Sequence, residues 1–216
     1  GWIDIASIRI NDIPTEITWA DSDSWQVTIP IGVGANLLEL KAYNRQGLEV
    51  GSDSITVTNT SAIDLASSRN TIISELHYNP SDPTPDEITA GHNDSDLFEF
   101  LEILNISETI EVNLSGASFT DGVAFNFPQG TTLAPGERLV IVSNQSAFAF
   151  RYGQGVATIA GEFSGQLRNS GEHIRFEASD TSAIADFTYG DGNPWPESAD
   201  GGGYSLVFSG ADPNLP

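Results

Sequence analysis

The chain has 216 residues, of which 39% are hydrophobic, and it contains 21 glycines and 11 prolines, which allows one large or two small β-rich domains with buried cores. Its formal net charge of −22 disfavours binding to nucleic acids and to anionic membrane surfaces, because these partners carry charge of the same sign. The absence of cysteine excludes disulfides, thiolate catalysis and zinc–thiolate sites, and no apolar run approaches the ~18 residues that span a bilayer.

Residues 1–60 show the alternation of apolar and polar side chains that is typical of short β-strands. Such alternation occurs around Ile8, from Trp25 to Ile29, from Leu38 to Ala42 and around Ile55. Gly, Asn, Asp and Pro residues separate these segments. About five short strands fit into this length, so the sequence predicts a small immunoglobulin-like β module.

Residues 61–70 carry no strand period, and we interpret them as a linker between two domains. Strand-like patterns resume at Thr71 and continue to about residue 210; they cover residues 72–78, 97–104, 125–127, 139–142, 173–176, 184–189 and 204–208. Ser146 to Tyr152 follows a polar Asn144 and precedes a glycine, which predicts one or two helical turns. Residues 211–216 form a C-terminal tail. The predicted fold is all-β, with two immunoglobulin-like β-sandwich modules in tandem (1–60 and 71–210).

Five segments in this second block carry a family resemblance. They are I-I-S-E-L-H-Y-N-P (72–80), E-F-L-E-I-L-N (99–105), L-S-G-A-S-F-T-D-G (114–122), F-N-F-P-Q-G-T-T-L-A-P-G-E-R-L-V-I-V (125–142) and Y-G-D-G-N-P-W-P-E-S-A-D-G-G-G-Y-S-L (189–206). With these segments the block resembles the lamin tail domain, the immunoglobulin-like module of nuclear lamins that also occurs in secreted bacterial proteins. Many members carry a tryptophan after L-S-G, where this chain has Ala117. A neighbouring side chain is therefore expected to fill that part of the core.

The first block is similar to the small β module that often precedes lamin tail domains in large bacterial surface proteins. Its marks are I-N-D-I-P (10–14), W-Q-V-T-I-P-I-G-V-G-A-N-L-L-E-L (25–40) and S-D-S-I-T-V-T-N (52–59). In bacterial proteins of this family the lamin tail domain lies beside enzymatic domains. The resemblance therefore implies an architectural or adhesive role and not a catalytic one.

The segment 79–96 is expected to be a long acidic loop without secondary structure, and such loops are often binding elements. Asp94, Asp96 and Glu99 place three carboxylates within six residues, a spacing that could surround a Ca²⁺ ion. The stretch 94–99 lacks the glycine and the regular ligand positions of an EF-hand loop. A solvated acidic loop is the alternative, so the sequence predicts no cofactor and leaves calcium as the possible one.

Glu75 and Glu102 each share a strand face with apolar residues, so each needs a partner. An arginine, namely Arg138, Arg168 or Arg175, could form a structural ion pair with either carboxylate. The alternative is a pair of catalytic carboxylates, as in glycosidases.

Three histidines, His77, His92 and His173, are far apart in the sequence. We expect His77 and His173 to be half-exposed strand residues. A three-histidine zinc site would require the loop that contains His92 to fold back over two strands.

Four tryptophans raise the question of sugar binding, because exposed aromatic rings on a β-sandwich can stack on sugars. Trp25 alternates with Val27 and is expected in the core, whereas Trp19 precedes a polar stretch and is the sugar-stacking candidate. Trp195 lies between two prolines and is expected to plug the core.

The sequence thus predicts a non-catalytic module of a larger exported bacterial protein, located outside the cell or at its surface. It would serve spacing, anchoring or protein contact. Its partners would be other domains of the parent chain or cell-surface proteins, without nucleic acid and without direct membrane insertion. The alternatives are a carbohydrate- or calcium-binding accessory module beside a catalytic domain, and a weak hydrolase that uses Glu75 and Glu102.

Overall fold

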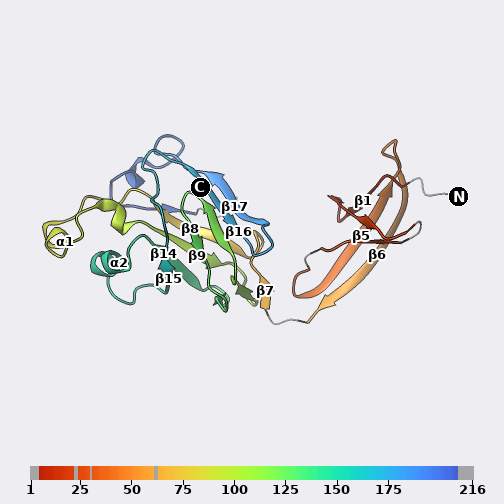
Figure 1. The fold of residues 1–216 in the computed structure, drawn as a ribbon, viewed down its shortest axis with the longest axis horizontal. Helices are drawn as coiled ribbons and strands as arrows, with labels where there is room; N and C mark the ends of the chain where they lie inside the picture. The colour runs from red at the N-terminus through yellow and green to blue at the C-terminus, as the bar shows by residue number, and fades with distance from the viewer. Residues whose placement is uncertain (1–4, 22–23, 30, 61–62, 209–216) are drawn as a thin grey trace. The chain divides into compact units, whose positions relative to one another are not determined.

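The computed structural model describes residues 5–21, 24–29, 31–60 and 63–208. The chain divides into two compact units, Gly1–Ala62 and Ile63–Pro216, which we call the N-terminal and C-terminal units. Strands dominate both units (Figure 1), so the predicted all-β fold class is confirmed. Among the described residues, no helix is both long and apolar enough to cross a membrane.

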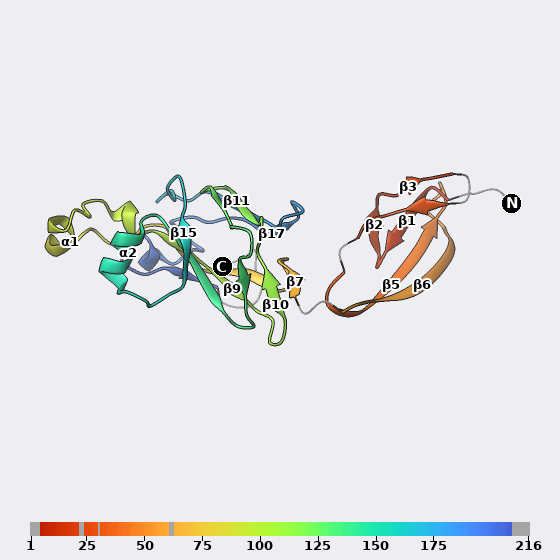
Figure 2. The same ribbon diagram turned by 60° about the horizontal axis from the view of Figure 1, so that its bottom comes forward.

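The N-terminal unit contains a four-stranded antiparallel sheet and a separate hairpin. The sheet has the order β2 (Ile13–Thr15), β1 (Ser7–Ile10), β5 (Gly34–Tyr43) and β6 (Glu49–Asn59). The hairpin pairs β3 (Thr18–Trp19) with β4 (Trp25–Gln26). Ile8 and Ile10 are buried, as the alternation in β1 predicts. Figure 2 shows the curved pair β5–β6, the longest pairing of this unit.

The C-terminal unit contains three sheets in the part of the chain that the structure describes. The five-stranded sheet has the order β15 (Ile159–Glu162), β14 (Arg138–Val142), β9 (Phe100–Asn105), β8 (Thr71–His77) and β18 (Leu206–Val207). The four-stranded sheet has the order β12 (Phe125–Asn126), β11 (Ser118–Asp121), β16 (His173–Glu177) and β17 (Ala183–Thr188). The smallest sheet has the order β13 (Thr132–Leu133), β10 (Glu111–Asn113) and β7 (Ile63–Leu65).

Strand β7 lies within the segment that the sequence predicts as a linker. It pairs in parallel with β10, where Ile63 faces Glu111 and Leu65 faces Asn113. The side chain of Asn70 then closes the following turn, because it donates to the Leu65 carbonyl. Residues 63–70 therefore fold with the C-terminal unit, and the prediction of a linker over the whole of 61–70 is wrong; residues 61 and 62 lie outside the described residues.

The principal hydrophobic core contains residues from the five-stranded and four-stranded sheets, including Leu101 and Ile103 of β9 and Ile174 of β16. The rings of Phe119 and Phe176 stack with their centroids 4.5 Å apart. Ala117 is buried in this cluster. Trp195 packs against the same cluster from its edge, as the sequence predicts.

A second, smaller cluster lies on the opposite face of the five-stranded sheet. It contains Phe100, Val140, Val142 and Phe148, and Phe148 belongs to α2 (Gln145–Tyr152). The Oδ1 atom of Asn144 accepts a hydrogen bond from the Ala147 N–H at 2.9 Å and caps this helix. The predicted helix over 146–152 is thus confirmed. Because α2 covers one end of the sheet, the strands are buried on both faces there.

Candidate interaction surface

The segment 79–98 is folded, and the prediction of a loop without secondary structure is wrong. It contains α1 (Pro85–Thr89) and the short 3₁₀-helix η1 (Ser95–Phe98). Thr84 and Glu87 form a capping box: the Thr84 Oγ1 accepts from the Glu87 N–H, and a Glu87 carboxylate oxygen accepts from the Thr84 N–H at 2.7 Å. Pro85 occupies the first position of the helix, where its fixed φ angle is favourable and its missing N–H costs nothing.

A buried ion pair fastens this segment to α2. The Arg151 Nε atom lies 2.7 Å from Glu87 Oε1, and Arg151 Nη2 lies 2.9 Å from Glu87 Oε2. The two side chains are only 13% and 5% exposed. Arg151 also donates to the Ser81 carbonyl at 3.0 Å, and its guanidinium lies 3.4 Å from the centroid of the Phe98 ring. The hydrogen bond from Arg151 is the main reason why the pKa of Glu87 falls to about 2.

His77 lies under α2 and is buried, so the expectation of a half-exposed histidine is wrong for this residue. Its ring stacks on Phe100 at a centroid distance of 5.2 Å, and Tyr152 meets it edge-on. The Nε2 atom is buried without a hydrogen-bond partner. Burial, with a smaller contribution from Arg151, lowers the pKa of His77 to about 4 and keeps the ring neutral.

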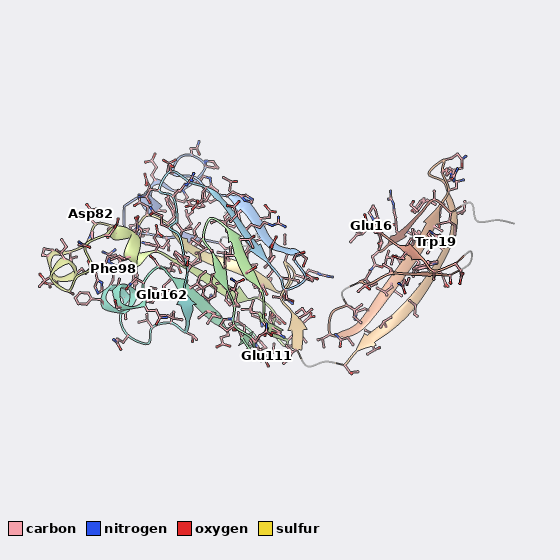
Figure 3. The ribbon with its side chains drawn as sticks, in the orientation of Figure 1. Glu16, Trp19, Asp82, Phe98, Glu111 and Glu162 are labelled. Carbon is pink, nitrogen blue, oxygen red and sulfur yellow. The ribbon has the colours of Figure 1, made fainter. Side chains whose placement is uncertain are left out.

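Two large apolar residues that are next in sequence to this ion pair have exposed side chains. Ile88, which follows Glu87, is 52% exposed, and Phe150, which precedes Arg151, is 49% exposed. The His92 ring lies against Phe150 with a centroid distance of 5.5 Å. We call Ile88, His92 and Phe150, together with the exposed carboxylates of Asp82, Asp86 and Asp94, the α1–α2 surface. Figure 1 shows both helices at the same end of the C-terminal unit, and Figure 3 labels Asp82 and the underlying Phe98 there.

The three candidate calcium ligands have separate local roles in the structure. Asp94 caps η1 by accepting from the Asp96 N–H, and Asp96 accepts from the Gln166 side chain at 3.0 Å. Glu99 is fully buried, and its Oε2 atom accepts from the Leu167 N–H at 3.0 Å. Burial raises the pKa of Glu99 to about 9, so this carboxyl is neutral at pH 7.

No group of three or more histidine, aspartate or glutamate side chains within the described ranges is arranged to hold a metal ion. This finding covers the three calcium candidates and also His77, His92 and His173, which the fold places in separate surroundings. His77 lies beneath α2, His92 lies against Phe150, and His173 is on β16.

Glu75 and Glu102 face each other on β8 and β9. Glu102 Oε1 accepts from the Ser74 hydroxyl at 2.7 Å and from Arg138 Nε at 2.9 Å, and Glu75 accepts from the Ser205 hydroxyl. Of the three arginines proposed as partners, Arg138 is therefore confirmed for Glu102. Each carboxylate is engaged by neighbours on its own sheet, which favours the structural interpretation.

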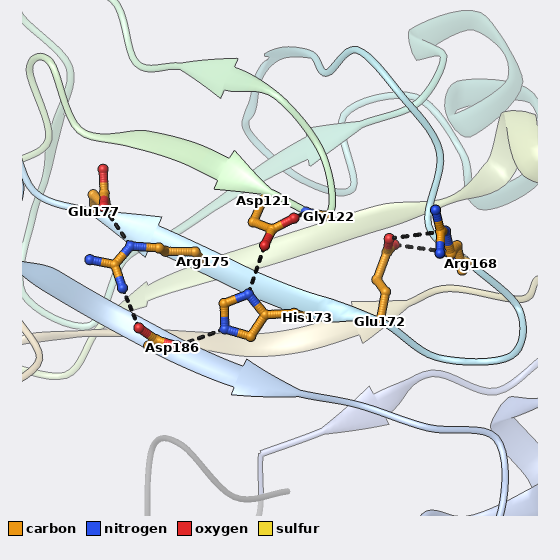
Figure 4. Close-up of polar contacts among 8 residues, drawn as sticks. All are labelled: Asp121, Gly122, Arg168, Glu172, His173, Arg175, Glu177 and Asp186. Carbon is orange, nitrogen blue, oxygen red and sulfur yellow. Dashed lines mark hydrogen bonds and ion pairs between the residues drawn. The ribbon is translucent and has the colours of Figure 1, made fainter.

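A network of ion pairs that the sequence analysis missed crosses the four-stranded sheet (Figure 4). His173 Nδ1 lies 2.8 Å from Asp121 Oδ2, and His173 Nε2 lies 2.7 Å from Asp186 Oδ1. Arg175 bonds to Glu177 at 2.5 Å and also to Asp186. The bonds to Asp121 and Asp186 raise the pKa of His173. His173 is partly exposed, as the sequence predicts. The network joins β11, β16 and β17. In the sequence it is indicated only by polar residues at alternate positions of these strands.

Trp19, the sugar-stacking candidate, is 42% exposed and faces Trp25 in the β3–β4 hairpin.

In the C-terminal unit, an open hollow of about 550 Å³ lies beside the loop after β9. Residues 104–108, Pro135, Gly136 and Arg138 line it. Its mixed polar and apolar wall contains no arrangement of paired carboxylates.

The C-terminal unit is thus a β-sandwich of the immunoglobulin-like class, with a helical cap on one sheet and with its arginines at positions 138, 151 and 175 in ion pairs. The family model of the lamin tail domain matches residues 64–191, which is more than half of the chain. The chain belongs to the lamin tail domain family, as its sequence motifs predict.

Comparison with solved structures found the "Bacteroides ovatus mixed-linkage glucan utilization locus (MLGUL) SGBP-B in complex with mixed-linkage heptasaccharide". The sequence identity is 12% and the TM-score is 0.21, with 83% of this chain and 34% of that chain covered. This chain thus spans about a third of that protein's length. A likeness at this level carries no argument about function. No curated protein matches the chain.

Proposed function

We propose that the chain is a non-catalytic interaction module of a larger exported bacterial protein, which provides spacing, anchoring or protein contact at the cell surface. One observation carries this proposal: the side chains that could perform chemistry are engaged as structural groups. Glu102 is paired with Arg138, His173 lies between two aspartates, and His77 is buried and neutral. A catalytic acid or base instead needs access to a substrate and a pKa near the working pH.

The open hollow in the C-terminal unit and the net charge of the chain support the same function. The hollow beside Arg138 is open to solvent, whereas active sites are generally concave pockets that enclose much of their substrate. The net charge of −22 keeps a protein soluble in a salty extracellular medium, where screening limits repulsion to within ~10 Å. It also supports the exclusion of nucleic acids as partners.

Enzyme assays with a matched variant test the proposal. We expect the purified chain not to hydrolyse chromogenic glycosides, esters or phosphate esters. Glu102→Gln should lower the melting temperature, because the ion pair with Arg138 is lost, without changing any rate above background. Turnover that disappears in Glu102→Gln would show that the chain is an enzyme.

A second candidate function, carbohydrate binding, is favoured by one observation, namely the exposed ring of Trp19 in a β-hairpin. Stacking on a sugar requires such an accessible aromatic face. Binding of soluble β-glucans in affinity electrophoresis that is lost in Trp19→Ala would establish this function. If the glucan changes the migration of neither protein, carbohydrate binding is ruled out and protein contact remains as the proposed function.

Calcium binding is the other way in which the chain could serve as an accessory module, and it is less favoured than carbohydrate binding. Glu99 holds its proton at pH 7, and a protonated carboxyl is a poor ligand for a hard cation. If Asp94, Asp96 and Glu99 nevertheless bind the ion, millimolar Ca²⁺ should raise the melting temperature and EDTA should reverse the change. An unchanged melting temperature would eliminate calcium.

A further inference from the structure

We propose that the α1–α2 surface is the contact site of the module and that it binds a basic segment of another protein that carries apolar side chains. This inference rests on the proposed function, because it names the surface and the kind of partner through which an interaction module would act. Three features of the C-terminal unit carry it: exposed apolar side chains, a fixed scaffold beneath them and a uniform sign of charge around them.

The first feature is the exposed apolar area of Ile88 and Phe150. Isolated apolar residues are common on protein surfaces and need no explanation. Here, however, the two side chains lie on α1 and α2, which contact each other and are joined by the Glu87–Arg151 pair. The His92 ring extends this apolar area through its contact with Phe150. Such a cluster is suited to the desolvated centre of an interface.

The second feature is the rigidity of the scaffold. The Glu87–Arg151 pair is buried, the Thr84–Glu87 capping box holds α1, and the His92 N–H donates to the Glu87 carbonyl at 2.8 Å. The buried ion pair distinguishes this segment from a solvated acidic loop, whose charged side chains would all face water. Because the backbone of α1 is already ordered, a partner would pay little entropy to fix it on binding.

The third feature is the sign of the charge. Residues 79–98 contain no lysine or arginine, and Arg151, the one basic residue of α2, is engaged by Glu87. The exposed charges at this surface are the carboxylates of Asp82, Asp86 and Asp94. An apolar centre with an acidic rim complements lysine or arginine side chains interspersed with leucine-like ones, and it repels acidic proteins and nucleic acids.

The partner is therefore a protein segment and not a simple cation. A metal ion or polyamine would satisfy the carboxylates but would leave Ile88 and Phe150 in water. A neutral apolar peptide would cover these two side chains but would gain nothing from the acidic rim. A peptide with both kinds of side chain uses both parts of the surface.

Fluorescence anisotropy with the full chain tests this proposal. The probe is a short fluorescein-labelled peptide of alternating lysine and leucine. We expect saturable binding that weakens as salt is added, and about ten-fold weaker binding to the double variant Ile88→Ser/Phe150→Ser. Both side chains are exposed, so their replacement should leave the fold intact. The matched control, Ile13→Ser/Leu48→Ser, changes two exposed apolar residues of the N-terminal unit and should bind like the unaltered chain.

Two comparison peptides separate the contributions. Replacing leucine by serine in the peptide should weaken binding about ten-fold, and replacing lysine by glutamate should abolish it. Equal affinity of the lysine–serine peptide, or of the Ile88→Ser/Phe150→Ser chain, would overturn the proposal, because binding would then be general charge attraction.

A second readout does not depend on a variant. In NMR spectra of the unaltered chain, the lysine–leucine peptide should shift the signals of the Ile88 methyl groups and the Phe150 ring more than those of Ile13. Shifts spread over the whole acidic surface would contradict the assignment. The two proposals fail separately: failure of peptide binding removes this surface, whereas hydrolysis that depends on Glu102 removes the non-catalytic function.

Discussion

Glu99 is a fully buried carboxyl group whose pKa is raised to about 9 from an ordinary value of 4.5. Between these two pH values the folded chain keeps a proton that the unfolded chain releases, so the free energy of unfolding falls as the pH rises through this window. Glu99→Gln keeps an oxygen acceptor for the Leu167 N–H but cannot ionise. We expect the variant to lose less stability than the parent chain between pH 5 and pH 8, roughly the middle of that window. Urea denaturation at several pH values measures this difference, and parallel pH profiles for the two proteins would contradict it.

His77 has the opposite pH dependence. Its pKa is lowered from 6.5 to about 4, so between these values the unfolded chain binds a proton that the folded chain does not. The stability contribution of the neutral ring is present above pH 6.5 and is lost as the pH falls towards 4. His77→Phe should preserve stacking on Phe100 and remove the buried, unpartnered Nε2 atom.

We therefore expect the His77→Phe chain to retain its stability in mild acid better than the parent chain does. Thermal melts in buffers on both sides of the ordinary histidine pKa provide the measurement. His92→Phe is the matched control, because the His92 ring is partly exposed. Equal acid sensitivity of the parent and His77→Phe chains would show that His77 does not titrate on unfolding.

At the scale of elements, the Glu87–Arg151 pair should determine whether α1 stays attached to α2. Arg151→Met removes the cation and leaves the Glu87 carboxylate poorly solvated, at a cost of about 1–3 kcal/mol. The N–H groups of Ile88 and His92, which donate to Thr84 and Glu87, should then exchange with deuterium faster, while those of β9 stay protected.

The double variant Arg151→Met/Glu87→Leu is the control for this prediction. It removes both charges, so it should recover part of the lost protection. Exchange rates in Arg151→Met that match those of the parent chain would mean that the ion pair does not hold the segment.

The contrast between α1 and α2 shows what the sequence could indicate about local structure. The helix α2 follows from Asn144 as a cap and Gly153 after the last turn, and both signals are local. The helix α1 is missed because three prolines suggest a loop, although Thr84-Pro-Asp-Glu87 is a capping-box pattern with proline at the first helical position. That pattern predicts a helix that begins at Pro85.

Other features depend on contacts that are distant in the sequence and could not be predicted from local patterns. Ile73 and Leu76 both belong to the principal core, because a register shift after Ile73 interrupts the alternation in β8 and turns His77 to the outer face under α2; the local sequence reveals neither the shift nor the cover. Strand β7 is three residues long, and its partner β10 lies far along the chain. For the site, the sequence identified the acidic segment 79–96 but not the buried arginine that organises it.

At the scale of the whole molecule, the two units should fold independently. Among the residues that the structure describes, the buried hydrophobic clusters of the C-terminal unit contain only residues between Ala66 and Leu206. We expect a fragment that begins at Ile63 to melt cooperatively at the temperature of the corresponding transition in the full chain, and to bind the lysine–leucine peptide equally well. Differential scanning calorimetry tests this expectation. A fragment that aggregates or melts at a lower temperature would show that residues 1–62 stabilise it.

The position of β18 has a mechanical consequence. This two-residue strand is antiparallel to β8, with Val207 opposite Glu75, and the Phe208 N–H donates to the Ser74 carbonyl. The chain therefore leaves β18 towards the same end of the sheet at which it enters β8. A pulling force applied at Thr71 and Phe208 would break these hydrogen bonds one after another and not all together. Under tension the C-terminal unit should thus lengthen first by peeling off β18, while the central strands β9 and β14 remain paired.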